Sequence, residues 1–248
     1  MKGTRLIMGM PVTLDVIDVW ASEAVLAEVF DYFVYVDEKF STYKEHSEIM
    51  QINRHELTLD QASDDVRTIF MLAEQTRQET GGYFDIERHG QYDPSGIVKG
   101  WAIYQAAEIL RHKGFANYYV AAGGDVQVVG KNERGENWRV GIQNPFNSRE
   151  IVKVLSVTDC GVATSGTYIR GQHIYNPKQA GELIMDIVGL TVIGPDIYEA
   201  DRFATAAFAM ALAGIELIER LDGFEGYLID RDRQATFTSG FTRYVYHA

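Results

Sequence analysis

Two oxygen-bearing side chains in an alanine-rich segment have the spacing of a metal site. Asp201 and Thr205 lie four positions apart, so on a helix they share one face, one turn apart. A carboxylate and a hydroxyl are hard oxygen ligands of the kind that Mg²⁺ prefers. A simpler interpretation stays open, in which the helix dipole favours the acid and Thr205 bonds back to its own helix.

Three glycine-containing turns could bring the backbone close to a ligand: residues 81–85, 93–100 and 121–125. Glycine allows a close backbone approach, and a helix N-terminus presents unpaired N–H groups to an anion. Lys99, in the second turn segment, could supply a cation to such a ligand. Taken alone, each segment is better explained by ordinary turn chemistry, since glycine is the usual turn residue.

A histidine lies between two turn signals. His173 follows Gly171 and precedes the Asn176-Pro177 pair, where a ring nitrogen can reach solvent. With a reference pKa of about 6.5, such a side chain could act as a base near neutral pH. A turn histidine without a catalytic role is the commoner case, so this assignment needs further support.

The spacing of apolar residues predicts the elements that must position these groups. Helical periodicity predicts helices over residues 22–39, 60–80, 97–112 and 198–221. Residues 41–53 and 83–96 are polar and turn-rich, which indicates loops. Short β-rich runs over residues 4–18, between 117 and 194, and over 226–230 and 235–248 predict antiparallel strands. We therefore expect an α+β fold, with residues 1–248 forming a single domain of antiparallel sheet packed with helices.

Composition and charge exclude several function classes. The chain has 35 acidic and 23 basic residues, a net charge of −12, which disfavours nucleic acid as a general partner. A polyanionic substrate would need a local cation from a lysine, an arginine or a metal. The single cysteine, Cys160, excludes an intramolecular disulfide and a thiolate cage for a metal. We expect no membrane span and a cytoplasmic location, because no long apolar run or signal peptide is visible.

The ordered set of motifs resembles the ApbE family of FAD:protein FMN transferases. Each motif is weak alone, but together they follow the order of the family along most of the chain. The matching segments are Met8-Gly9-Met10, Phe40-Ser41-Thr42-Tyr43, Gly82-Tyr83-Phe84-Asp85-Ile86, residues 93–100, Gly123-Gly124-Asp125, Trp138-Arg139-Val140-Gly141-Ile142, Ala163-Thr164-Ser165-Gly166, residues 173–177, Glu199-Ala200-Asp201 and Ala204-Thr205.

The resemblance implies a reaction and its partners. Such enzymes cleave the pyrophosphate of FAD, move FMN onto a Ser or Thr hydroxyl of an acceptor protein and release AMP. Because this is a phosphoryl-type transfer, catalysis rests on positioning and charge neutralisation. Mg²⁺ would then allow an acidic protein to accept the negatively charged pyrophosphate.

The resemblance also implies roles for individual residues. The Mg²⁺ ligands would be Asp201, Thr205 and the carbonyl of Gly96, and His173 would activate the acceptor hydroxyl. The catalytic pair is therefore His173 and Asp201. The remaining candidates would bind the FAD substrate: Met8, Tyr43, Phe84, Asp85, Ile86, Asp93, Lys99, Thr164, Ser165 and Tyr175.

Two alternatives to the transferase stay open. With water as the acceptor, the same groups would make the chain an FAD pyrophosphatase that yields FMN and AMP. The connection at residues 87–92 is shorter than the family usually has, which would remove part of the wall of the nucleotide site. This feature favours a third possibility, a non-catalytic FAD-binding protein.

Overall fold

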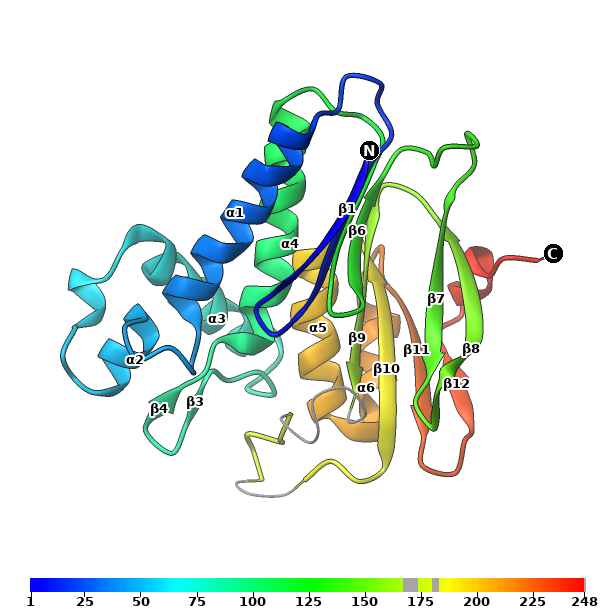
Figure 1. Cartoon of the computed structure of the whole chain (residues 1–248). Coiled ribbons are helices and arrows are strands. Elements are labelled where there is room, and N and C mark those ends of the chain that lie inside the picture. Colours follow the sequence, from blue (N-terminus) through cyan, green and yellow to red (C-terminus); the bar gives the residue numbers. More distant parts are fainter. Residues whose placement is uncertain (167–173, 180–182, 248) are drawn as a thin grey trace.

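The computed structural model describes residues 1–166, 174–179 and 183–247, and most strands in these ranges form one large sheet (Figure 1). Its eight strands have the order β1-β2-β5-β6-β9-β10-β11-β12, and every neighbouring pair is antiparallel. Their bounds are β1 Lys2–Ile7, β2 Met10–Val16, β5 Tyr118–Ala122, β6 Asp125–Val129, β9 Cys160–Gly166, β10 Ile187–Gly194, β11 Glu225–Asp230 and β12 Ala235–Phe237. Two hairpins stand apart from it, β3 Glu87–Arg88 with β4 Gln91–Tyr92, and β7 Trp138–Asn144 with β8 Asn147–Val157.

The helices cover one face of the large sheet. Their bounds are α1 Glu23–Phe40, α2 Glu48–Asn53, α3 Asp64–Glu79, α4 Ser95–His112, α5 Ile197–Ala209 and α6 Gly214–Arg220, with short 3-10 turns at Leu59–Gln61, Ala211–Ala213 and Phe241–Tyr244. α5 packs on β9 and β10 and against α4, and α4 in turn contacts α1 and α3. Figure 1 shows α4 and α5 next to the sheet, α1 and α3 outside them, and the β7-β8 hairpin on the opposite side.

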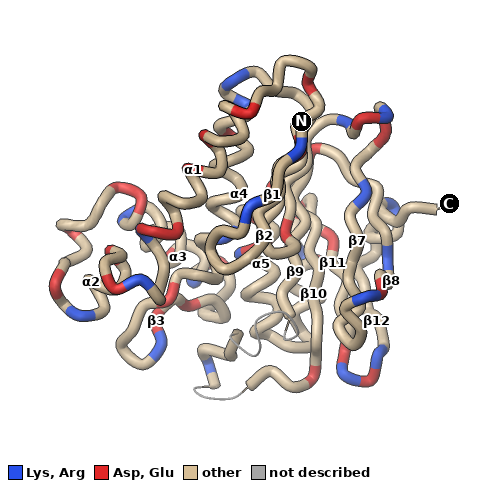
Figure 2. Tube along the Cα trace, viewed as in Figure 1, with Lys and Arg blue, Asp and Glu red and all other residues tan. Residues whose placement is uncertain are grey.

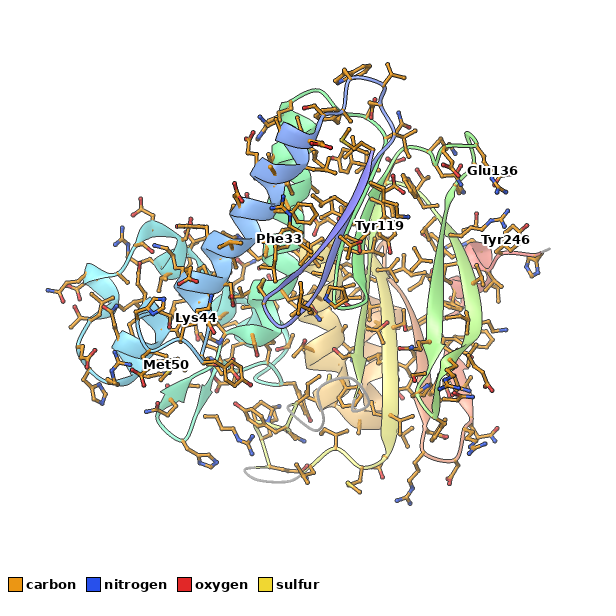
Figure 3. The ribbon with its side chains drawn as sticks, viewed as in Figure 1. Phe33, Lys44, Met50, Tyr119, Glu136 and Tyr246 are labelled. Atoms are coloured by element: carbon orange, nitrogen blue, oxygen red, sulfur yellow. The ribbon has the colours of Figure 1, made fainter. Side chains whose placement is uncertain are left out.

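Alternating strand residues divide the interior into two hydrophobic cores. Val12 and Leu14 of β2 are fully buried on the helical side, where they join Phe33 of α1 (Figure 3). Trp138 and Val140 of β7 belong to the second core, between the sheet and the β7-β8 hairpin. Because successive strand side chains point to opposite faces, the same sheet supplies both cores.

The α+β class predicted from the sequence, an antiparallel sheet packed with helices, is confirmed. Two helix starts follow the expected chemistry. Ser22 precedes α1 and accepts a hydrogen bond from the N–H of Val25 at 3.4 Å. Asp196 precedes α5 and accepts one from the N–H of Glu199 at 2.9 Å. These side chains satisfy backbone donors that the first turn of a helix leaves unpaired.

The predicted strand at 4–18 and the predicted helix at 198–221 are both broken by backbone turns. Met8 and Gly9 have φ of 56° and 70°, which folds residues 2–16 into the β1-β2 hairpin. Ala211 has a φ of 54°, a left-handed conformation that no right-handed helix can pass through. The long helix therefore ends at Ala209, and α6 begins at Gly214.

Two other segment predictions were wrong. The expected loop at 41–53 contains α2, which Ser47 caps by accepting a hydrogen bond from the N–H of Met50 at 3.1 Å. Six residues are too few for a clear helical period. The expected strand at 235–248 stops at Phe237, because the Thr238 hydroxyl accepts from the N–H of Gly226 at 2.9 Å and Phe241 turns into the second core.

Candidate active site

The crossing of α4 and α5 buries an aspartate against a helix backbone. The N–H of Gly100, in α4, donates to Oδ2 of Asp201, in α5, at 2.8 Å. A Cβ on Gly100 would lie 2.6 Å from the Cβ of Asp201, closer than two such atoms can approach. Only glycine therefore fits at position 100, and this close approach places the Asp201 carboxylate beside the second turn of α4.

Lys99 lies between two buried carboxylates. Its Nζ is 3.3 Å from Oδ1 of Asp201, and it also forms a close ion pair with Oδ2 of Asp125, the first residue of β6. The side chains of Asp125 and Asp201 are 2% and 3% exposed, whereas that of Lys99 is 17% exposed. The other oxygen of Asp125 accepts from the N–H of Thr164 at 2.9 Å, which ties β6 to β9.

This arrangement leaves an excess of buried negative charge. Burial raises the pKa of Asp201 to about 7, and the charge of Asp125 adds to the rise, while Lys99 and the Gly100 N–H oppose it. Among the described residues, one ammonium faces two carboxylates here, so full ionisation of these three groups gives a net charge of −1. A second cation, or a proton, would balance it.

The side chain of Thr205 completes an oxygen-rich corner beside Asp201. Its hydroxyl donates to the carbonyl of Gly96 at 3.4 Å, so α4 and α5 present two neutral oxygens side by side. In the part of the chain that the structure describes, no three His, Cys, Asp or Glu side chains gather into a metal site. A divalent ion here would use hydroxyl and carbonyl oxygens besides one carboxylate, a donor set that fits Mg²⁺.

Most of the predicted site residues line one cavity around this corner. The cavity is bounded by Phe84, Asp85, Gly96, Lys99, Thr164, Ser165, Tyr175, Asp201 and Thr205. They come from the loop after α3, from α4, β9 and α5, and from the segment at 174–179. The structure therefore brings together residues that are more than 100 positions apart in the sequence.

A second cavity adjoins the first. It contains Met8, Tyr43 and Asp93, and it shares Ser95 and Lys99 with the first cavity. Met8 lies in the turn between β1 and β2, and the Tyr43 side chain is 95% exposed. An extended ligand that contacted all of these residues would pass Lys99.

One predicted residue lies at a different cavity. Ile86 lines neither of these cavities but a third one, behind Asp85, with Phe70 and Tyr92. His173 lies outside the described residues. The nearby Tyr175 is described: its hydroxyl donates to the carbonyl of Glu87 at 3.1 Å, and its ring packs under Arg88.

Sequence reasoning missed the role of Asp125 in this cluster. The residue was visible in the Gly123-Gly124-Asp125 turn, but its partner is Lys99 in another element. The signal in the sequence is an aspartate directly after two glycines; its burial and its pairing with Lys99 depend on the fold.

Comparison with known proteins identifies the family of this chain. The model of the ApbE family matches residues 8–90 and 86–228. The chain belongs to the ApbE family. The ApbE match contains every candidate residue of both cavities, so the resemblance seen in the motifs is confirmed.

Curated ApbE relatives align with part of this chain. An FAD:protein FMN transferase of Vibrio cholerae is 32% identical over 127 residues, covering 48% of this chain and 38% of that protein. One from Salmonella typhimurium is 28% identical over 149 residues, covering 56% of this chain and 43% of that protein. The aligned part is thus less than half the length of these relatives.

Solved structures with the ApbE fold match over nearly the whole length. The flavin transferase ApbE from Vibrio cholerae has a TM-score of 0.85 at 21% identity, with 98% of each chain covered. The apo form of the flavinyl transferase ApbE from Pseudomonas stutzeri has a TM-score of 0.84, with 99% of this chain and 97% of that chain covered. At such identities the likeness establishes the fold. Among the described residues, no helix is both long and apolar enough to cross a membrane.

Proposed function

We propose that this chain is a Mg²⁺-dependent FAD:protein FMN transferase, which moves FMN from FAD onto a Ser or Thr hydroxyl of an acceptor protein and releases AMP. The observation that carries the proposal is the corner of the first cavity where Asp201, Thr205 and the Gly96 carbonyl lie beside Lys99, which also lines the second cavity. The family match and the names of the curated relatives support the same reaction.

The proposed ion site explains why an acidic chain can hold a dinucleotide. Asp201, Thr205 and the Gly96 carbonyl would hold Mg²⁺, which when bound neutralises charge on the pyrophosphate. Lys99 lies between the cavities, where it can face the same phosphates with a positive charge. In this arrangement the charge of the substrate is balanced locally, although the protein as a whole is acidic, with charged residues spread over its outer loops and helices (Figure 2).

The remaining residues orient FAD and the acceptor. Phe84, Asp85 and Tyr175 would contact the nucleotide from the first cavity, and Met8, Tyr43 and Asp93 would contact it from the second. Thr164 and Ser165 would face the phosphates, and Ile86 would support the wall from behind.

The transfer needs no reactant besides FAD and the acceptor hydroxyl. The acceptor oxygen bonds to the phosphorus of the FMN half, and the bond from that phosphorus to the bridging oxygen breaks. The bridging oxygen keeps the electron pair and leaves with AMP. His173 would take the proton of the acceptor hydroxyl, as a general base with a pKa near neutrality can.

The test combines the purified chain with FAD, Mg²⁺ and a candidate acceptor domain. We expect the acceptor to gain the mass of an FMN group and AMP to appear in equal amount, with both products lost when a chelator replaces Mg²⁺. The matched control is an acceptor whose target Ser or Thr is changed to Ala. AMP formation without any acceptor would indicate the pyrophosphatase, and tight FAD binding without AMP would indicate a non-catalytic binder.

A further inference from the structure

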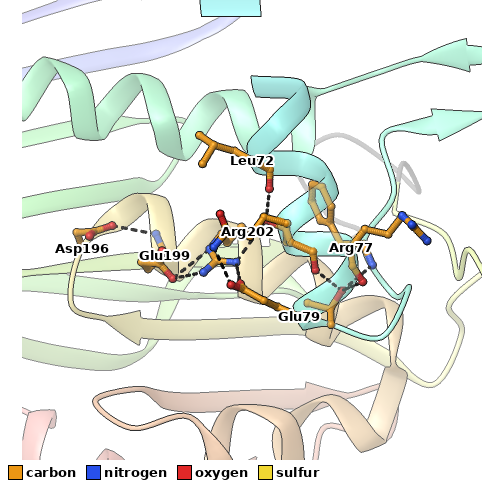
Figure 4. Close-up of polar contacts among 10 residues, drawn as sticks. Leu72, Arg77, Glu79, Asp196, Glu199 and Arg202 are labelled. Carbon is orange, nitrogen blue, oxygen red and sulfur yellow. Dashed lines mark hydrogen bonds and ion pairs between the residues drawn. The ribbon is translucent and has the colours of Figure 1, made fainter. Parts of the chain in front are cut away.

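The face of α5 turned toward α3 carries a second buried cation, one position after Asp201. Arg202 is 4% exposed and forms ion pairs with Glu79 and with Glu199, the latter at 2.6 Å (Figure 4). It also donates to the Thr76 hydroxyl at 3.3 Å. Thr76 and Glu79 belong to the last turn of α3, so Arg202 joins that turn to the helix that carries Asp201 and Thr205.

The end of α3 is also hydrogen-bonded to the wall of the first cavity. Thr80, which follows Glu79, donates from its hydroxyl to the Thr76 carbonyl at 2.7 Å and accepts from the N–H of Phe84 at 3.2 Å. Phe84 and Asp85 line the same cavity as Asp201 and Thr205. A continuous set of hydrogen bonds therefore runs from Arg202, through the end of α3, to the backbone of the cavity wall.

We propose that Arg202 is a positioning residue, which fixes the wall formed by Phe84 and Asp85 at a set distance from Asp201 and Thr205. The proposal rests on the function proposed above, because it assigns this wall to the FAD site. Two faces of α5 then have different roles: Asp201 and Thr205 present oxygens to the cavity, while Arg202 holds the wall formed by Phe84 and Asp85. Because small displacements of binding groups cost large factors in positioning, loosening this tie should weaken FAD binding.

If Arg202 only stabilised the fold, FAD affinity and stability would change together in its variants. Removing one member of a buried ion pair destabilises a protein, since the partner charge stays buried and unpaired. Removing all the charges together is often neutral for stability. A variant with Arg202→Met, Glu79→Gln and Glu199→Gln therefore separates the two roles, because it removes the unpaired charges and also removes the directional tie.

The experiment measures the Kd of FAD, in the presence of Mg²⁺, by flavin fluorescence, together with the midpoint of thermal unfolding. For the triple variant we expect a midpoint close to that of the wild type and FAD binding weaker by about tenfold. Arg202→Lys, which keeps the charge, should recover part of the affinity. Glu74→Gln is the matched control, since it removes an exposed pair with Arg77 on the same helix and should leave the Kd unchanged.

A further variant keeps the inference testable if the triple variant does not fold. Thr80→Val keeps the size of the side chain but removes the acceptor for the Phe84 N–H, so it should also weaken FAD binding. If the folded triple variant binds FAD within twofold of the wild-type affinity, the inference alone is overturned. If the triple variant is unfolded, the same result in Thr80→Val overturns it. A wild-type chain that does not bind FAD would contradict the proposed function and this inference together.

Discussion

Two clusters in this molecule each place one cation between two carboxylates, yet they differ in which groups are buried. Around Arg202 the cation is buried, with a side chain 5% exposed, while Glu79 and Glu199 are 37% and 25% exposed. Around Lys99 the order is reversed, since both carboxylates are almost fully buried and the ammonium is more exposed. The two clusters contain the same kinds of charged group, yet the cation is the buried member of one and the carboxylates are the buried members of the other.

The difference indicates what each cluster is suited to do. Excess negative charge around Arg202 reaches solvent, where water stabilises it, so the cluster is complete as a link between α3 and α5. Around Lys99 the described residues enclose an excess of negative charge, which a counter-charge would stabilise. Burial, rather than the number of acidic and basic groups, separates the cluster that links two helices from the one that we propose binds a cation.

The largest difference between the clusters should follow loss of Asp201. In Asp201→Asn we expect the rate of FMN transfer to fall by at least about 100-fold, because the proposed metal site loses its carboxylate. Its unfolding midpoint at neutral pH should not fall, since the change removes a buried charge. Initial rates and thermal melts measure both effects. Asp64→Asn, at an exposed side chain of α3, is the matched control, and an equal loss of rate there would contradict the assignment.

Loss of Arg202, unlike loss of Asp201, should lower the stability of the fold. Arg202→Met leaves Glu79 and Glu199 without their shared partner, so we expect a loss of about 2 kcal/mol in the free energy of unfolding, less than for a fully buried pair because both carboxylates partly reach solvent. Urea denaturation measures this loss. A stability equal to that of the wild type would show that the two carboxylates are sufficiently solvated without the arginine.

The comparison also predicts a dependence on pH. The folded-state pKa of Asp201 is raised to about 7, so its contribution to stability is fully present below its unfolded pKa and is lost as pH rises through about 7. Without Mg²⁺, wild-type stability relative to Asp201→Asn should fall between about pH 4 and pH 7, and added Mg²⁺ should reduce this fall. Urea denaturation across this range measures it, and a constant difference would contradict the buried-charge account.

The smallest effect should come from an exposed pair in α3. Glu74 and Arg77 are about half exposed, so Glu74→Gln should leave the unfolding midpoint and the transfer rate unchanged within error. Thermal melts and initial rates check this together. A clear loss of stability would mean that the exposed fraction of an ion pair does not determine how much the pair stabilises the fold.

The sequence predicted the parts of the site that depend on local geometry. Asp201 and Thr205 are one helical turn apart, and both line the first cavity, because the helical period fixes their relation. The pairing of Asp125 with Lys99 and the contacts of Arg202 could not be predicted, since they join elements far apart in the chain. Ile86 was assigned to the flavin, but the side on which a short extended segment presents each residue is set by its packing. The role of His173 stays a prediction.

The most direct test of the central claim is a calorimetric titration of Mg²⁺ into the chain in the presence of FAD. The account predicts saturable binding by the wild type, and loss of that binding in Asp201→Asn and in Thr205→Val. Binding of equal affinity in all three proteins would place the ion elsewhere and contradict the account.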